Sequence, residues 1–143
     1  MKDESKTVPT SVRLPSGIRA WLDKMTRKES RRSVSDLIVE LLDESIRMRR
    51  CPGIYFVYEP SGRTAKIAGT GLGVWEVLRD FRQSGEDPKA LRAAFPTLTQ
   101  AQTTAALMYA QTYPKDIDRE IEENAALTAE ALVERYPGLV HIE

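Results

Sequence analysis

Apolar and polar positions in residues 7–50 follow two periods, first that of a strand and then that of a helix. Residues 7–14 alternate, with one face made of Val8, Thr10, Val12 and Leu14 and the other of Thr7, Pro9, Ser11 and Arg13. Pro15 then stands at a helix start. A helix ending near Glu29 is predicted by the apolar spacing i, i+3, i+4 and i+7 of Ile18, Trp21, Leu22 and Met25.

A second helix is predicted from Ser33 to about Arg49. Ser33 with Asp36 three residues later resembles a capping box that uses the shorter acid. The apolar stripe of this helix consists of Val34, Leu37, Ile38, Leu41, Leu42 and Ile46. One strand and two helices of this size cannot bury both stripes, and a lone strand leaves its backbone groups unpaired. We therefore expect a homodimer or higher oligomer, with a dimer core formed by Val12, Leu14, Trp21, Leu22, Leu37, Ile38 and Leu41.

Residues 7–50 resemble the ribbon-helix-helix family of repressors, the Arc and MetJ type. The resemblance is carried by Ser11-Val12-Arg13-Leu14-Pro15, Trp21-Leu22 and Arg32-Ser33-Val34-Ser35-Asp36-Leu37-Ile38. It implies that two strands, one from each chain, pair across the dimer axis and enter the major groove of double-stranded operator DNA. The side chains implied to contact base edges are Pro9, Ser11 and Arg13. Arg is the commonest specific reader of guanine, whereas Pro9 offers no donor and shortens the ribbon.

The same resemblance implies a DNA phosphate held at the start of the second helix. Backbone amides at a helix N-terminus bind anions, and the residues in question are Ser33 and Val34. Arg31 and Arg32 lie next to them in the sequence and would neutralise the charge of the DNA backbone.

The remaining residues, 51–143, predict a small hairpin followed by helices. Arg50-Cys51-Pro52-Gly53 marks the boundary, because Pro cannot continue a helix and Gly tolerates the angles of a helix end. Ile54 to Ala68 is typical of a hairpin with its turn at Pro60-Ser61-Gly62. The predicted helices are one with Val74, Val77, Leu78 and Phe81, a short one after Asp87-Pro88, one capped by Thr99, an acidic one beginning at Pro114, and either its prolongation or a further helix capped by Thr128. The expected fold class is mainly α with short β.

Residues 62–123 are similar to a bacterial family of small helical domains of unknown function. Members are often described as VapB-type antitoxins or regulators and are encoded near PIN-like ribonuclease toxins. The similarity is carried by the runs Gly62-Arg63-Thr64-Ala65-Lys66-Ile67-Ala68-Gly69-Thr70-Gly71-Leu72-Gly73-Val74-Trp75-Glu76-Val77, Phe95-Pro96-Thr97-Leu98-Thr99-Gln100-Ala101-Gln102, Ala105-Ala106-Leu107 and Tyr113-Pro114-Lys115-Asp116-Ile117-Asp118. It implies a helix-turn-helix-like fold and an antitoxin context. The helix from Thr99 to Thr112 has no Lys or Arg, which favours a packing or partner role over DNA binding.

The net charge of zero hides a division along the chain. Residues 1–50 hold 12 basic and 8 acidic side chains, whereas residues 115–143 hold 3 basic and 8 acidic ones. A basic head and an acidic tail indicate two partners of opposite character, and scattered solvated charge is the alternative. The expected toxin-binding residues in the acidic segment are Ile117, Arg119, Ile121, Leu132, Val133, Arg135 and Tyr136. Its carboxylates Asp116, Asp118, Glu120, Glu122 and Glu123 are expected to form a solvated helix face.

Composition weighs against enzymes, cofactors and membranes. With a single Cys and a single His, neither a zinc framework nor a His-dependent triad is expected. The glycines at 69, 71 and 73 lack the spacing of a dinucleotide fingerprint and predict a strand-to-helix turn. Apolar runs are too short for a transmembrane helix, the N-terminus does not resemble a secretory signal, and one unpaired Cys suits a reducing cytoplasm.

Together these features predict a DNA-binding antitoxin that represses its own operon and neutralises a PIN-like ribonuclease. The alternative is a stand-alone transcriptional or plasmid-maintenance repressor whose C-terminal domain only oligomerises. In both cases residues 1–50 form the dimerisation and DNA-binding domain. Residues 51–143 form a helical, helix-turn-helix-like domain with an acidic C-terminal segment, which binds the toxin or only oligomerises.

Overall fold

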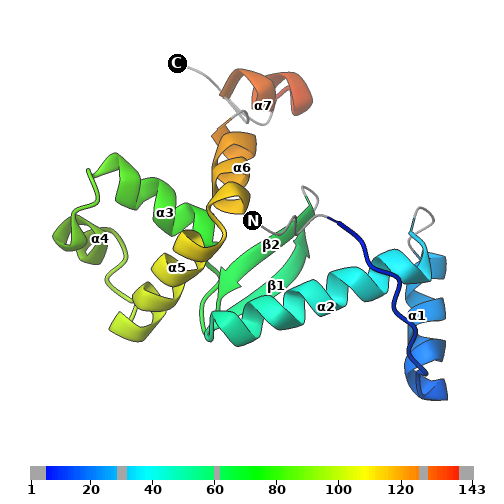
Figure 1. Cartoon of the computed structure of the whole chain (residues 1–143). Coiled ribbons are helices and arrows are strands. Elements are labelled where there is room, and N and C mark those ends of the chain that lie inside the picture. The colour runs from blue at the N-terminus through cyan, green and yellow to red at the C-terminus, as the bar shows by residue number, and fades with distance from the viewer. Residues whose placement is uncertain (1–5, 29–31, 60–61, 126–128, 139–143) are drawn as a thin grey trace. The chain divides into compact units, whose positions relative to one another are not determined.

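A computed structural model of the chain describes residues 6–28, 32–59, 62–125 and 129–138. The chain divides into two compact units, residues 1–43 and residues 44–143 (Figure 1). The division falls inside a helix, because the last turns of that helix pack with the residues that follow.

The first unit contains two helices, as the apolar periodicity predicts. They are α1 (Ser16–Lys28) and α2 (Val34–Arg50), and the second continues into the other unit. Ser33 Oγ accepts a hydrogen bond from the Asp36 backbone N–H at 3.0 Å, which confirms the predicted cap. Leu22 and Leu37 are buried within this unit.

The strand expected over residues 7–14 is not formed in the single chain. Residues 6–15 are neither helix nor strand. A strand needs a hydrogen-bonded neighbour, and the sheet found within the described residues has two strands, residues 54–59 and 62–67, and none from residues 6–15. The two-stranded ribbon requires a second chain, so it stays a prediction.

The second unit is built on a two-stranded antiparallel hairpin, as predicted. β1 (Ile54–Glu59) pairs with β2 (Gly62–Ile67) in a register that sets Ile54 opposite Ile67. Gly62 opens β2 with φ +117°, a backbone angle that other residues rarely adopt.

Five helices follow the hairpin in the described part of the chain. They are α3 (Val74–Gln83), α4 (Pro88–Ala94), α5 (Gln100–Thr112), α6 (Pro114–Ala125) and α7 (Ala129–Arg135). Asp87 caps α4 through the Lys89 N–H, and Thr99 with Gln102 forms a complete capping box on α5. The predicted starts of α4, α5 and α6 are therefore confirmed, and the mainly helical fold with short β is observed. Thr128, the predicted cap of the last helix, lies outside the described residues.

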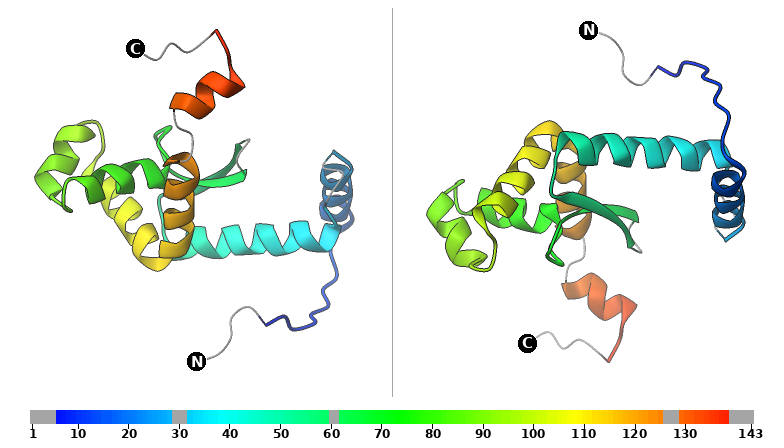
Figure 2. Two further views of the ribbon diagram at one scale, coloured as in Figure 1. Left: turned by 90° about the horizontal axis from the view of Figure 1, so that it is seen from above. Right: turned by 90° about the horizontal axis from the view of Figure 1, so that it is seen from below.

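The hydrophobic core of the second unit lies between the hairpin and three helices. α3 packs against α5 and α6, and α5 also contacts both strands (Figure 2). The largest fully buried side chains are Tyr109, Ile67, Ile117, Val74, Val77 and Cys51. Cys51 directly follows α2, so the end of that helix is anchored in this core. None of the described helices has the length and apolar character needed to cross a bilayer.

Candidate functional site

The residues expected to contact DNA lie before α1 and at the start of α2. Pro9, Ser11 and Arg13 are exposed. They lie on the segment that would pair with the same segment of a second chain in a ribbon. Ser33 is also exposed, whereas Val34 is half-buried. Arg31 lies outside the described residues.

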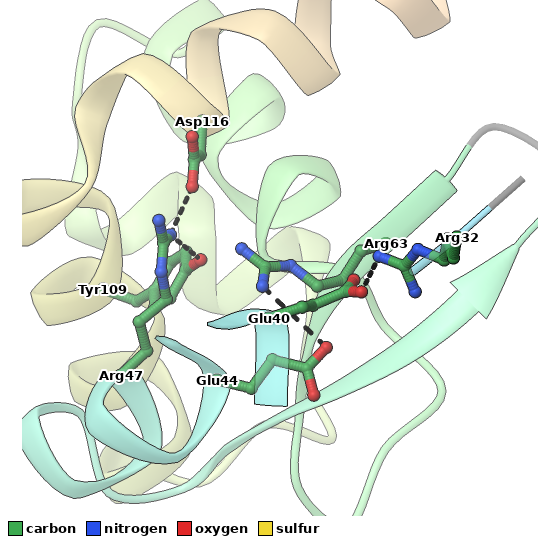
Figure 3. A network of polar contacts seen from close by, with 7 residues as sticks. All are labelled: Arg32, Glu40, Glu44, Arg47, Arg63, Tyr109 and Asp116. Carbon is green, nitrogen blue, oxygen red and sulfur yellow. Dashed lines mark hydrogen bonds and ion pairs between the residues drawn. The ribbon is translucent and has the colours of Figure 1, made fainter. Parts of the chain in front are cut away.

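Arg32, the other predicted phosphate contact, forms an ion pair with Glu40 of α2 (Figure 3). Both side chains belong to the first unit. A phosphate would therefore have to compete with Glu40 for the Arg32 guanidinium, and this pairing was not expected from the sequence.

The predicted dimer core divides into buried and exposed members. Leu22 and Leu37 are buried in the single chain, and Leu14 and Ile38 are half-buried. Val12 is 68% exposed, Trp21 48% and Leu41 36%. Further large apolar side chains of this segment are exposed, namely Val8, Ile18, Val39, Leu42, Ile46 and Met48. Much of the apolar stripe of α1 and α2 is thus uncovered in one copy of the chain.

A polar network in the second unit centres on Arg47, near the end of α2 (Figure 3). Its guanidinium donates to the Tyr109 hydroxyl at 2.9 Å and forms an ion pair with Asp116 of α6. It also lies over the Tyr113 ring, 4.0 Å from the centroid. Burial acts to lower the pKa of Arg47, but the hydrogen bond to Asp116 and the interaction with Tyr109 outweigh it, so the pKa is raised. Burial raises the pKa of Tyr109 to about 12, although Arg47 acts against this.

Beside this network lies a polar cavity of about 290 Å³, lined by residues of α2, β1, β2, α3 and α6. Glu120 of α6 lines it and is only 6% exposed. Its Oε2 atom accepts no hydrogen bond from the described residues. Burial raises the pKa of Glu120 to about 7, although the neighbouring charge of Arg119 and a hydrogen bond from the Ala65 backbone lower it. The prediction that the acidic residues of α6 form a solvated face is wrong for Glu120.

The predicted toxin contacts differ widely in accessibility. Ile117 is fully buried in the core of the second unit and Ile121 packs against that core, so the prediction of Ile117 as a surface anchor is wrong. Arg119 is exposed, and its Nε atom lies 3.8 Å from Oε1 of Glu123, one turn further along α6. In and just after α7, Leu132 and Val133 are half-buried, whereas Arg135 and Tyr136 are exposed.

The sequence analysis did not identify Glu120 or Arg47 as important residues of the second unit. The sequence contains a pattern that predicts the burial of Glu120. Ile117, Glu120, Ile121 and Asn124 stand at i, i+3, i+4 and i+7, which is the spacing of one helix face. That spacing places Glu120 on the buried side of α6. Arg47 left no comparable signal, because it lies among the basic residues that end α2.

The glycine-rich segment serves as a turn between β2 and α3. Gly69 has φ +81°, and a Cβ at Gly73 would lie 2.8 Å from the Trp75 indole nitrogen. The backbone angle therefore accounts for Gly69, and the close approach of the Trp75 ring accounts for Gly73. No group of three or more candidate ligands for a metal ion occurs in the described residues.

Comparison with known families gives one match. Residues 61–110 match the model of a family described as "Protein of unknown function (DUF433)". The match covers the hairpin's second strand, helices α3 and α4, and α5 except for its last two residues. No curated protein and no solved structure matches the chain.

Proposed function

We propose that the chain is a DNA-binding antitoxin that acts as a dimer, represses its own operon through residues 7–50 and neutralises a ribonuclease toxin through its C-terminal segment. The observation that carries the proposal is the uncovered apolar face of the first unit. Trp21, Leu41 and Leu42 are 48%, 36% and 58% exposed, although helical periodicity places each of them on the apolar stripe of its helix. A second copy of the chain is the partner that would cover it.

DNA binding is the role that fits a dimer of this segment. Ser11 and Arg13 are exposed ahead of α1, and Ser33 opens α2 with a capped N-terminus that suits a phosphate. The first 50 residues carry 12 basic and 8 acidic side chains, an excess that favours association with DNA. Base reading is assigned to Arg13, because its planar group can bond two acceptors of a guanine.

Toxin binding is assigned to α7 and its surroundings. Because Ile117 and Ile121 pack in the core of their own unit, the exposed Arg135 and Tyr136 are the better candidates for contact. An acidic segment with apolar side chains is complementary to a basic, RNA-binding groove.

A truncation separates the antitoxin from the stand-alone repressor. Stopping the chain after Ala125 keeps Ile117 and Glu120 in place, whereas stopping after Pro114 removes both from the core. The chain that ends at Ala125 should still bind DNA from upstream of its own reading frame. It should fail to rescue growth when the product of the adjacent gene is expressed. Rescue by the chain ending at Ala125 would contradict toxin binding through α7. Full-length protein that rescues nothing would favour the stand-alone repressor.

A further inference from the structure

The cavity beside Glu120 has no role in the function proposed above. It lies wholly within the second unit, and its size is at the lower end for small-molecule sites, which start at about 300 Å³. A space of this size admits a single polar group or a short side chain. Its lining is Arg47, Glu59, Gly62, Arg63, Thr64, Trp75, Asp116, Arg119, Glu120, Glu123 and Asn124.

The other charged groups that face Glu120 across this cavity have partners of opposite sign. The pairs are Arg47 with Asp116, Arg63 with Glu44, Glu59 with Lys66 and Arg119 with Glu123. Glu120 differs, because its Oε2 atom is buried and accepts no hydrogen bond from the described residues. An ionised carboxylate in that position is costly unless a donor reaches it.

We propose that this cavity binds an organic cation bearing N–H donors, a guanidinium or alkylammonium group, which pairs with the buried carboxylate of Glu120. Such a group supplies both the positive charge and the hydrogen bond that Oε2 lacks. A divalent metal fits less well, because the other carboxylates of the lining are already paired and the described residues contain no group of metal ligands.

Protonation of Glu120 competes with the cation. With a pKa of about 7, the carboxyl is mostly neutral at pH 6 and mostly ionised at pH 8. Affinity for the cation should therefore fall about tenfold per pH unit below pH 7 and level off above it.

The test is an NMR titration of the ¹⁵N-labelled full chain with methylguanidinium chloride at pH 8. The Ala65 amide, which bonds the Glu120 carboxylate, should shift along a saturable curve. Urea, which has the same planar shape without the charge, and NaCl at equal ionic strength should give no saturable shift. Glu120→Gln should abolish saturation, whereas Glu122→Gln, on the exposed side of the same helix, should leave it unchanged.

A linear response to methylguanidinium, or equal binding by the Glu120→Gln chain, would overturn the proposal. As a readout that needs no variant, ¹³C-labelled glutamate should show the Glu120 carboxyl titrating at lower pH when the cation is present, and an unmoved titration would also overturn it. Titration with the tripeptide Gly-Arg-Gly and with free arginine distinguishes two sources of the cation, a protein side chain and a free metabolite. Tighter binding of the tripeptide identifies a side chain of a partner protein, and tighter binding of arginine a free metabolite. This site neither requires nor tests the antitoxin function.

Discussion

Replacing Arg47 with Ala should destabilise the second unit far more than removing an exposed arginine of the same unit. The change removes a hydrogen bond of 2.9 Å to Tyr109, a charge over the Tyr113 ring and the ionic partner of Asp116. The side chains of Arg47 and Asp116 are only 13% and 28% exposed, so solvent screens their pairing weakly.

Three contacts make up the expected loss in the free energy of unfolding. A hydrogen bond from a charged donor contributes roughly 1.5 kcal/mol, and a cation–π contact roughly 0.5–1 kcal/mol. Leaving a half-buried Asp116 unpaired adds about 1 kcal/mol, toward the low end for an unsatisfied group. The sum is about 3 kcal/mol. The matched control is Arg82→Ala, whose pair with Asp118 is 40% and 60% exposed and should contribute about 0–1 kcal/mol.

The assay is urea unfolding followed by Trp75 fluorescence in a Trp21→Phe background, which leaves one Trp in the chain. A double-mutant cycle with Tyr109→Phe should give a coupling energy of about 1 kcal/mol between Arg47 and Tyr109. If Arg47→Ala lowers the free energy of unfolding no more than Arg82→Ala does, the network does not hold the end of α2 in this unit.

Two further predictions concern the pH dependence of stability and the association of chains. Because the folded pKa of Glu120 is raised from 4.5 to about 7, the folded state keeps a proton that the unfolded chain loses, and the contribution of Glu120 to the free energy of unfolding should be greatest below pH 4.5 and fall by about 2–3 kcal/mol as pH rises to 7. Urea unfolding across this pH range should show the fall in the wild type and in Glu122→Gln but not in Glu120→Gln, and parallel curves would refute the assignment. The uncovered apolar face predicts that the first unit unfolds at a temperature that rises with protein concentration. Trp21→Glu should weaken association at least tenfold, as measured by light scattering. A wild-type monomer at micromolar concentration would contradict this prediction.

The elements of this fold could be predicted from the sequence where local chemistry fixes them. Thr99 and Gln102 specify the start of α5, and Asp87 with Pro88 specifies that of α4, because caps act within one turn. The strand before α1 could not be tested on one chain, because its hydrogen-bond partners are not in that chain.

The contacts among distant residues could not be predicted in the same way. Arg47 meets Tyr109 and Asp116 across 62 and 69 positions of sequence, and nothing in the local pattern selects these partners. Ile117 was misassigned for a related reason, since an apolar residue on an acidic helix suits a partner surface as well as a core. Only the packing of α6 against α3 and α5 decides between them.

The most direct test of the proposed function is fluorescence anisotropy of the full chain on DNA from immediately upstream of its own reading frame. The account predicts that the wild type prefers this DNA to a scrambled duplex, with two or more chains on each site, and that Arg13→Ala loses the preference at a cost of about 1–3 kcal/mol per half-site. Equal binding of both duplexes by the wild type, or an Arg13→Ala chain with the preference intact, would contradict it.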